Sequence, residues 1–330
     1  MKILVMGAAG MIGRKLIERL LANGELRGEK ILAIHGFDVV AGSFADTAGI
    51  EVTVSAGDIS DKATVDALVD SQPDVIFHLA AIVSGEAEAD FEKGYRVNFV
   101  GTQNLLDSII ARGGYVPRIV YASSIAVFGA PFPEVIDDEF HLTPLTSYGT
   151  QKAIGEMLLA DYTRKGHMDG IGLRFPTIVV RPGKPNLAAS GFFSNIIREP
   201  LSGQSAVLPV SEDVMHWMAS PRSAVNFCIH AAEIDGHQVG PRRNLTMPGL
   251  AITVGEMIEA LERLAGAKTA GLIERKSDEV ISGIVANWPR NFVATRAESL
   301  GFAAEQSFDD IIRAHVEDEL DGKWPGASQS

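Results

Sequence analysis

Three glycines, Gly7, Gly10 and Gly13, lie where the first apolar run of the chain, KILVM, gives way to a helix-like stretch. Glycines at such a junction permit a tight turn and let the backbone approach a pyrophosphate, which the free amides at the start of the helix can bind. A glycine triplet alone is weak support, but its position in the first strand-to-helix unit strengthens it. The sequence therefore predicts a dinucleotide-binding loop, which also includes Met11 and Ile12.

The first half of the chain alternates short apolar strands with helical stretches. We expect strands at KILVM, KILAIHGFD, EVTVS, DVIFHLAA, PRIVYAS and GIGLRF, and helices at residues 11–23, 61–71, about 91–112 and about 148–165. The apolar runs are unbroken, which is typical of strands covered on both faces. Strand–helix repetition of this kind predicts an α/β fold, a Rossmann-type doubly wound parallel sheet with right-handed crossovers.

After Phe175 the rhythm changes to a Pro- and Gly-rich loop, RPGKPNLAASG, and then to helices expected near 192–201, 254–265 and 309–320. We therefore predict two domains. An NAD-binding Rossmann domain covers residues 1–175, with 212–235 packing back on it. A smaller, interleaved C-terminal substrate domain covers 176–211 and 236–330.

Composition restricts the partners and the compartment. The 330 residues are 46% hydrophobic with a formal net charge of −13 and no Lys/Arg cluster, which disfavours binding to nucleic acid or an anionic membrane surface. We expect neither a secretory signal nor a membrane span. The one cysteine, Cys228, excludes an intramolecular disulfide and suits a reducing cytoplasm. It is interpreted as a small core residue rather than a nucleophile.

Asp38 ends the second expected strand, in GFDVVAG. A carboxylate there can accept both ribose hydroxyls of an adenosine, whereas it would repel a 2′-phosphate. No Arg or Lys occurs between Val39 and Asp58 to neutralise such a phosphate. This favours NAD over NADP, although a surface aspartate at a strand end is the alternative.

Tyr148 and Lys152, in TSYGTQKAIGE, are four residues apart, so they share one face of the helix expected at 148–165. A phenol with a pKa near 10 is a poor base near neutrality, but an ammonium beside it favours the phenolate. Tyr148 could then take a proton from a substrate hydroxyl while hydride leaves the same carbon.

The glycine spacing G-x-x-G-x-x-G, the segments FHLAA and YASSIAVFG, and Y-x-x-x-K together resemble the extended branch of the short-chain dehydrogenase/reductase superfamily, the NAD-dependent epimerase/dehydratase family. The resemblance implies that Ser124 is the catalytic hydroxyl beside Tyr148 and Lys152, with Ser123 structural. It implies a homodimer that packs the helices around 98–112 and 148–165 of two chains together. It also implies further cofactor contacts from Asp58, Ile59, Leu79, Ala80, Ala81, Asn98, Tyr148, Lys152, Pro176 and Thr177.

Other residues depart from parts of that family. Dehydratases carry an Asp-Glu pair after the catalytic hydroxyl, where this chain has Ile125 and Ala126, so dehydration is disfavoured. Epimerases usually have Asn where this chain has Thr177, and no R-x-G-D-like segment precedes WPRNF. These differences weaken a nucleotide-sugar substrate. His78 is interpreted as a histidine satisfied inside the fold.

Three later segments, VVRPGKPN, FFSNIIREPL and MHWMASPRSAVNF, resemble the D-erythronate dehydrogenase family, NAD enzymes that oxidise a small sugar acid. A four-carbon acid needs a compact pocket and one or two cations for its carboxylate. The candidate cations are Arg181, Lys184, Arg198 and Arg222, each of which could instead be a solvated surface charge. His216 and Trp217 could line the pocket or pack in the core.

The leading hypothesis is NAD-dependent oxidation of a secondary alcohol of a small, D-erythronate-like sugar acid to the 2-oxo acid by Ser124, Tyr148 and Lys152. A nucleotide-sugar (UDP-sugar) 4-epimerase using the same three residues is the first alternative. A non-catalytic NAD-binding module is the second, which the intact catalytic set disfavours. No His/Cys/Asp/Glu grouping has metal-ligand spacing, so we expect no metal.

Overall fold

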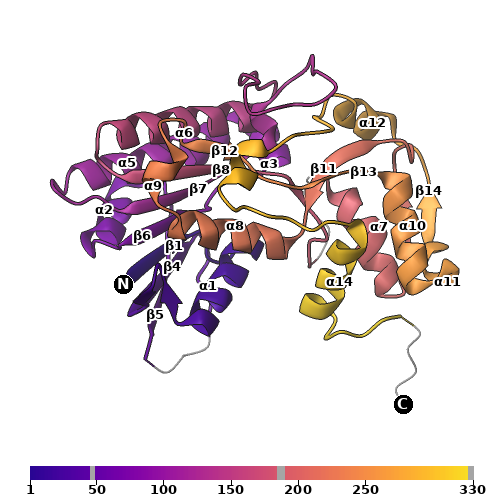
Figure 1. Ribbon diagram of the computed structural model, residues 1–330, viewed down its shortest axis with the longest axis horizontal. Helices are drawn as coiled ribbons and strands as arrows, with labels where there is room; N and C mark the ends of the chain where they lie inside the picture. The colour runs from indigo at the N-terminus through magenta and orange to yellow at the C-terminus, as the bar shows by residue number, and fades with distance from the viewer. Residues whose placement is uncertain (45–48, 184–189, 326–330) are drawn as a thin grey trace.

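The computed structural model describes residues 1–44, 49–183 and 190–325. Its larger part is built on a seven-stranded sheet with the order β12-β8-β7-β6-β1-β4-β5, in which every pairing is parallel (Figure 1). The strands are β1 (Lys2–Met6), β4 (Ala33–Asp38), β5 (Glu51–Ala56), β6 (Val75–His78), β7 (Arg118–Ser124), β8 (Asp169–Phe175) and β12 (Asn244–Thr246). The predicted Rossmann-type fold is confirmed.

Helices cover both faces of this sheet. On one face α8 (Pro221–Glu233) packs against α1 (Met11–Asn23), β7 and β8, and α9 (Gly236–Val239) packs against β8. On the other face α5 (Gly101–Ile110) lies between α2 (Lys62–Asp70) and α6 (Ser147–Arg164). Because both faces are covered, the central strands are largely apolar, and all four residues of β6 are buried.

The order of the strands reverses between β1 and β6, which are neighbours in the sheet. In open α/β sheets the ligand crevice lies at the carboxyl ends of the strands, where this reversal occurs. The glycine loop follows β1 there, and Leu79 follows β6. The fold thus brings the two predicted cofactor segments to one point.

The helix expected at about 91–112 is divided in the structure. α4 (Phe91–Gly94) is followed by a π-helical segment, Tyr95–Val100, and then by α5, while α3 (Ser84–Ala89) precedes them. Two glycines, Gly94 and Gly101, let this helical stretch pack closely against Gln151 and Ile59. A Cβ on Gly94 would lie 2.7 Å from Gln151 Nε2, and one on Gly101 would lie 2.7 Å from Ile59 Cγ2.

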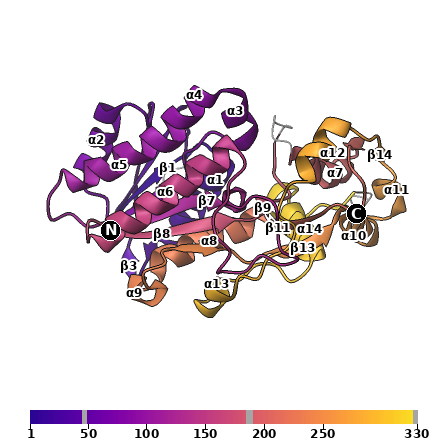
Figure 2. The same cartoon turned by 90° about the horizontal axis from the view of Figure 1, so that it is seen from above.

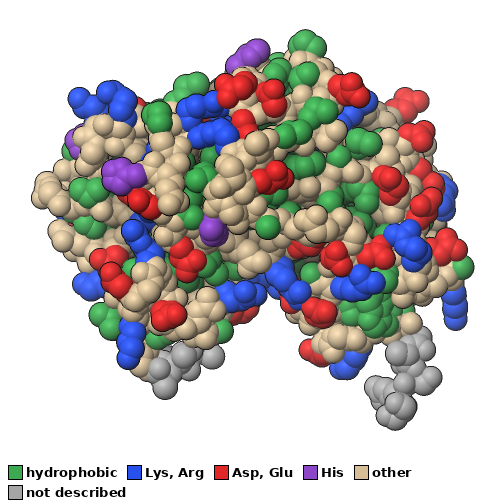
Figure 3. Space-filling model, viewed as in Figure 1, with side chains coloured by type: hydrophobic (Ala, Val, Ile, Leu, Met, Phe, Trp, Pro, Cys, Tyr) green, Lys and Arg blue, Asp and Glu red, His purple; other side chains and the backbone are tan. Residues whose placement is uncertain are grey.

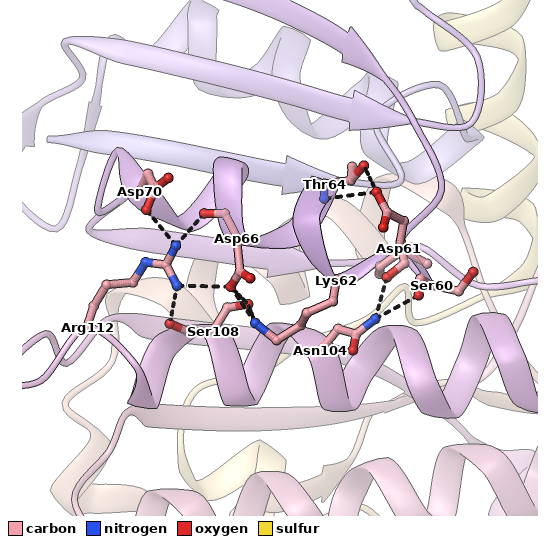
Figure 4. A network of polar contacts seen from close by, with 10 residues as sticks. Ser60, Asp61, Lys62, Thr64, Asp66, Asp70, Asn104, Ser108 and Arg112 are labelled. Atoms are coloured by element: carbon pink, nitrogen blue, oxygen red, sulfur yellow. Dashed lines mark hydrogen bonds and ion pairs between the residues drawn. The ribbon is translucent and has the colours of Figure 1, made fainter.

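A polar network joins α2 to α5 beside the predicted adenine-binding segment (Figure 4). Asp66 on α2 accepts hydrogen bonds from Lys62, from Ser108 Oγ at 2.7 Å and from Arg112 Nη1 at 3.1 Å. Asn104 Nδ2 on α5 donates to the carbonyl oxygens of Ile59 at 3.3 Å and Ser60 at 3.0 Å. These contacts fix the chain that leaves β5.

The smaller part lies at the other end of the molecule, as Figures 1 and 2 show from two directions. In the view of Figure 3 a notch in the lower edge separates the two parts. A separate apolar core fills the smaller part. Its elements are α7 (Gly191–Leu201), α10 (Val254–Ala265), α11 (Ala267–Ala270), α12 (Glu279–Val285), α14 (Phe308–Glu319) and the strand pair β10 (Ala206–Leu208) and β14 (Ile273–Arg275).

A three-stranded sheet, β13-β11-β9, lies between the two parts; its strands are β9 (Thr177–Ile178), β11 (Met215–Ala219) and β13 (Leu250–Thr253). The remaining elements are β2 (Glu25–Leu26), β3 (Glu29–Lys30), a 3-10 turn at Ile125–Val127 and α13 (Thr295–Ser299). Two elements within 236–330 depart from the predicted division, because α9 packs against β8 and β12 extends the main sheet beside the same strand. The domain limits otherwise stay a prediction.

Charged pairs tie α14 to the larger part. Lys15 on α1 pairs with Glu319, and Arg222 on α8 pairs with Glu317 at 2.9 Å and Asp318 at 2.6 Å. Within the described ranges, none of the helices is long and apolar enough to cross a membrane.

Candidate active site

The glycine loop has the geometry that a bound pyrophosphate requires. Gly7 has φ +93°, and a Cβ there would lie 2.7 Å from the backbone N of Ala80. A Cβ on Gly13 would lie 2.1 Å from the carbonyl oxygen of Gly7. Gly10 is the exposed N-cap of α1 and offers no side chain to the free amides of the first turn. Those amides can therefore receive a phosphate oxygen.

Asp38 lies directly beside this loop, at the end of β4. Its Oδ2 accepts a hydrogen bond from the Ala9 N–H at 2.9 Å, and its Oδ1 accepts one from the Val39 N–H at 2.7 Å. A carboxylate has about four acceptor positions, so lone pairs remain for two ribose hydroxyls. The residues present fit NAD. Asp38 would bind the adenosine ribose, and its hydrogen bond with Ala9 joins it to the glycine loop that would bind the pyrophosphate.

Asp58 and Ile59 follow β5, as the sequence indicates. The carboxylate of Asp58 accepts hydrogen bonds from the hydroxyl and the N–H of Ser60, which lowers the pKa of Asp58. The Ile59 side chain is only 3% exposed, because it packs against Gly101. Little of this side chain is therefore left to contact an adenine, and its predicted cofactor role stays a prediction.

Asn98, also predicted as a cofactor contact, has its carboxamide engaged by the protein. Asn98 Oδ1 accepts from the Ile82 N–H at 2.9 Å, while Nδ2 donates to the Ile82 carbonyl at 3.2 Å and to Gln151 Oε1 at 2.8 Å. Both of its amide protons are thus used. In this arrangement Asn98 fixes the chain that follows Leu79, Ala80 and Ala81, which remain predicted cofactor contacts.

Ser124, Tyr148 and Lys152 come from β7 and α6, which pack against each other. Ser124 ends β7, and its Oγ accepts the Ala126 N–H at 3.1 Å. Tyr148 is half-buried in the first turn of α6. Lys152 is only 3% exposed, and its Nζ lies 5.7 Å from the centroid of the Tyr148 ring. The ammonium and the phenol are therefore neighbours.

Gly149 explains the close approach of α6 to the end of β7. A Cβ at this position would lie 2.1 Å from the carbonyl oxygen of Ala126. Thr146 caps the helix by accepting the Gly149 N–H at 3.0 Å. The sequence analysis did not single out Gly149, although a glycine inside a helix and directly after Tyr148 indicates a close packing contact.

Burial has the largest effect on both titratable groups. It raises the pKa of Tyr148 to about 12, and a hydrogen bond with Ser124 opposes this rise. It lowers the pKa of Lys152 to about 7, and the negative charge of Glu156 opposes this fall. Burial thus has a larger effect on Tyr148 than Lys152 has, and the role of Lys152 in favouring the phenolate stays a prediction. A cation bound beside the phenol would favour the phenolate.

A buried ion pair supports this part of the site. Glu156, one turn after Lys152 on α6, is 1% exposed and accepts hydrogen bonds from Ser123 Oγ at 2.5 Å and from Arg174 Nη2 at 2.7 Å. This contact gives Ser123 the structural role that was predicted for it. Sequence reasoning missed Glu156, which the four-residue spacing Tyr148–Lys152–Glu156 could have revealed.

His78, the last residue of β6, is buried inside the fold and is not placed to act as a base. It is 2% exposed, and its Nε2 lies 2.9 Å from Thr102 Oγ1. Burial lowers the pKa of His78 to about 3. Cys228 is likewise fully buried, and burial raises the pKa of its thiol to about 12.

The predicted substrate cations differ in their surroundings. Arg222 pairs with two carboxylates on α14. Arg198 on α7 is held by Glu199 and by Asn195 Oδ1 at 2.8 Å, and it donates to the Arg181 carbonyl at 2.7 Å. Lys184 lies outside the described residues.

Arg181 differs from the other two arginines. Its Nη2 donates to Ser190 Oγ at 3.1 Å, and the structure records no carboxylate partner for it among the described residues. Burial and the neighbouring positive charge of Arg198 lower the pKa of Arg181. A half-buried guanidinium beside a second one is a suitable place for a carboxylate.

His216 and Trp217, on β11, face inward. Trp217 is 7% exposed and donates from Nε1 to the Met247 carbonyl at 3.1 Å. His216 is 3% exposed, and its two ring nitrogens lie next to Thr177 and Pro289. Neither ring nitrogen of His216 is left to hydrogen-bond a substrate, which favours the alternative of core packing; a substrate contact of this residue stays a prediction. Within the described ranges, no group of three or more His, Cys, Asp or Glu could hold a metal ion.

Known proteins resemble this chain over most of its length. Residues 3–220 match the profile of the NAD dependent epimerase/dehydratase family. The D-erythronate dehydrogenase of Cupriavidus necator is 45% identical over 322 residues, which cover 96% of this chain and 98% of that protein. The D-erythronate dehydrogenase of Haemophilus influenzae is 39% identical over 320 residues, which cover 97% of this chain and 100% of that protein.

Solved structures give the same fold. A structure described as the nucleoside-diphosphate-sugar epimerase from Agrobacterium tumefaciens is 58% identical, with a TM-score of 0.96 over 98% of this chain and 95% of that one. A GalE-like L-threonine dehydrogenase from Cupriavidus necator has a TM-score of 0.84 at 20% identity, covering 96% of this chain and 99% of that one. At that identity the likeness concerns the fold alone.

Proposed function

The chain belongs to the NAD-dependent epimerase/dehydratase family, and from this membership we propose that it oxidises a small sugar acid, D-erythronate or a close analogue, at the secondary alcohol next to the carboxylate. The observation that carries the proposal is the 45% identity, over nearly the whole of both chains, with a D-erythronate dehydrogenase. The resemblance deduced from the sequence is confirmed at the level of the family, and NAD is the cofactor that the family uses.

Ser124, Tyr148 and Lys152 are the proposed catalytic residues. Tyr148, in its phenolate form, accepts the proton of the substrate hydroxyl. Ser124 forms a hydrogen bond with the oxygen of that substrate hydroxyl. NAD, when bound, supplies the hydride acceptor. Lys152 would hold a ribose hydroxyl of the cofactor with its ammonium, and the carbonyl of Ala122, 2.7 Å from Nζ, keeps that ammonium in place. The half-buried setting of Tyr148 limits access of water to the proton transfer.

NAD would be held by the glycine loop and by Asp38. The amides that follow Gly10 would receive the pyrophosphate, and the carboxylate of Asp38 would receive the adenosine ribose. A 2′-phosphate would meet that carboxylate, so NAD is preferred over NADP. Pro176 and Thr177, directly after β8, would back the nicotinamide.

Arg181 is the proposed partner of the substrate carboxylate. It follows β9 by three residues, on the segment that leaves the carboxyl end of β8. The guanidinium of Arg222 is neutralised by Glu317 and Asp318, and that of Arg198 by Glu199. A substrate carboxylate would have to displace these partners, whereas the guanidinium of Arg181 donates to a serine hydroxyl and has no carboxylate partner among the residues that the structure describes.

A nucleotide-sugar epimerase is the second candidate. It is favoured by the 58% identical structure, which is described as a nucleoside-diphosphate-sugar epimerase. That reaction would use the same three residues and produce no net NADH. It would require a diphosphate site, for which the sequence shows no R-x-G-D-like segment before WPRNF.

One experiment separates these candidates. Purified protein is mixed with NAD and a panel of four- to six-carbon sugar acids, and NADH fluorescence is followed. NADH formation with one acid supports the dehydrogenase. Interconversion of two UDP-sugars without NADH would transfer the proposal to the epimerase, and NAD binding without turnover would leave a non-catalytic module.

We further propose a cytoplasmic homodimer formed through α5 and α6. Ile110 on α5 and Met157 on α6 are exposed large apolar side chains, which supports contact with a second copy of these helices. The single cysteine of the chain is compatible with a reducing compartment.

A further inference from the structure

Thr177 lies just beyond the carboxyl end of β8, the strand that pairs with the one carrying Ser124. It begins β9, two residues after Phe175 ends β8. Phe175 is in register with Ser124 across the β7–β8 pair. Thr177 is half-buried and follows the carboxyl end of β8, the end of the strands at which the ligand crevice of such sheets lies. A molecule bound in that crevice would meet the segment that carries this hydroxyl.

Two hydrogen bonds fix the direction of this hydroxyl. His216 Nδ1 lies 2.8 Å from the carbonyl oxygen of Pro289. A carbonyl can only accept, so Nδ1 carries the proton, and in a neutral imidazole Nε2 is then an acceptor. Thr177 Oγ1 lies 2.6 Å from Nε2 and must donate to it. The only proton of the Thr177 hydroxyl is used, and only its lone pairs remain.

The surroundings of His216 keep the ring neutral and in place. The ring lies parallel to that of Phe193, with an interplanar angle of 7° and centroids 5.4 Å apart, and its centroid is 5.3 Å from that of Trp288. Burial lowers the pKa of His216 to about 4, so the neutral form dominates near pH 7. An imidazolium would reverse the bond to Thr177.

We propose that His216 is a positioning residue that makes the Thr177 hydroxyl a hydrogen-bond acceptor only, so that the site selects a bound O–H or N–H group at this point. The donor is either a hydroxyl of the sugar acid or the amide of the nicotinamide, which share this chemistry. This inference rests on the proposed function, but the tautomer of His216 can be measured without it. A ligand group that can only accept, such as a carbonyl, is disfavoured there.

The first test reads the tautomer directly. Protein labelled with ¹⁵N-histidine is studied by NMR at pH 7, with His216→Phe used to assign the signals. A neutral ring protonated on Nδ1 is expected. An Nε2-protonated ring or an imidazolium would overturn the inference. This measurement needs no turnover, so it gives an answer even if no sugar acid is oxidised.

The second test measures how much the Thr177 hydroxyl contributes as a hydrogen-bond acceptor. Thr177→Val should lower kcat/KM about tenfold, the size of one neutral hydrogen bond, and Thr177→Ser should restore it. His216→Phe should produce a comparable loss, and the double variant should be no worse than either single one, because both act through one hydroxyl. Additive losses, or a loss below twofold in Thr177→Val, would contradict the proposal.

Analogues then identify the donor. With 3-acetylpyridine adenine dinucleotide, which lacks the amide N–H, the Thr177→Val loss should disappear if the cofactor is the donor. With a sugar acid that lacks one hydroxyl, the loss should disappear if that hydroxyl is the donor. A loss that persists with every analogue means that no ligand donor meets Thr177, and the proposal fails. If the wild-type protein forms no NADH but the His216 ring is protonated on Nδ1, the proposed function fails while the inferred tautomer stands.

Discussion

Lys152 donates a hydrogen bond from Nζ to the backbone carbonyl oxygen of Ala122 at 2.7 Å, which ties α6 to the strand that carries Ser124. This contact holds the ammonium beside Tyr148. Burial lowers the pKa of Lys152 to about 7, although the negative charge of Glu156 opposes the fall. The carbonyl of Ala122 favours the charged form, which is the form that the proposed reaction needs.

Tyr148→Phe should remove most of the oxidation of the sugar acid. Loss of a general base typically lowers the rate about 10²- to 10⁴-fold, while binding of NAD should stay within a few-fold of wild type. NADH formation and NAD titration measure the two effects. Tyr162→Phe is the matched control on α6, because it loses only the hydrogen bond to Asp107 at 2.9 Å. Equal losses in both variants would show that Tyr148 is not the base.

Asp38→Asn should weaken the preference for NAD. The amide keeps an oxygen for the Ala9 N–H, so the glycine loop stays anchored, but the charge that attracts the ribose hydroxyls is lost. The KM for NAD should rise about tenfold, as expected for one hydrogen bond to a charged group. The KM for NADP should rise less or fall, because repulsion of the 2′-phosphate is removed. A wild-type protein that uses NADP better than NAD would refute this role of Asp38.

Arg181→Met should raise the KM for the sugar acid about 10- to 100-fold, the range of a charge-assisted hydrogen bond, with a smaller effect on the KM for NAD. Arg222→Met is the control, since the Arg222 guanidinium is paired with Glu317 and Asp318 on α14. Steady-state kinetics with the best acid of the panel decide the matter. A larger rise of the KM for the sugar acid in Arg222→Met than in Arg181→Met would show that Arg222, not Arg181, binds the substrate carboxylate.

His315 should make the folded state sensitive to acid. It is 4% exposed on α14, and burial lowers its pKa from 6.5 to about 4. The unfolded chain therefore binds more protons between pH 4 and 6.5, and stability falls as the pH falls through this window. Between pH 7 and pH 5 this one side chain should cost about 2 kcal/mol of unfolding free energy.

Urea unfolding at pH 7 and pH 5 measures this loss. The difference between the two pH values should shrink by about 2 kcal/mol in His315→Leu. The same substitution of the exposed His237 serves as the control and should leave the difference unchanged. An unaltered difference in His315→Leu would mean that this histidine is not buried in neutral form.

Met157→Glu should dissociate the proposed homodimer. The Met157 side chain is 62% exposed on α6, and burying a carboxylate against a second chain without a partner is unfavourable. Size-exclusion chromatography with light scattering should show a monomer for this variant and a dimer for the wild type. Val280→Glu, at a position that is 73% exposed on α12, should remain dimeric. A monomeric wild type would end this proposal.

The larger part of the molecule could be predicted because its signals are local. The helix expected at 11–23 has those limits in the structure, since Gly10 precedes it and Gly24 ends it in a left-handed conformation. The strands of the parallel sheet could be recognised as unbroken apolar runs. Tyr148 and Lys152 could be paired because helix geometry alone brings them to one face.

Other features depend on contacts between residues far apart in the sequence. β9 has two residues, and it is a strand only because β11 lies beside it. The contact of His216 with Pro289 spans 73 positions, so the sequence offered no sign that this ring would be fully engaged. The hydrogen bonds of Asn98 with Ile82 likewise join residues sixteen positions apart, which no local pattern indicates.

The last strand of the main sheet affects how this protein can be made and divided. β12 pairs with β8, although about seventy residues of chain separate them. During synthesis the outer edge of β8 therefore has no strand beside it until Asn244–Thr246 leave the ribosome. An unpaired edge is a template for association with other chains. A fragment that stops after Phe175 should therefore tend to aggregate rather than serve as an isolated nucleotide-binding module.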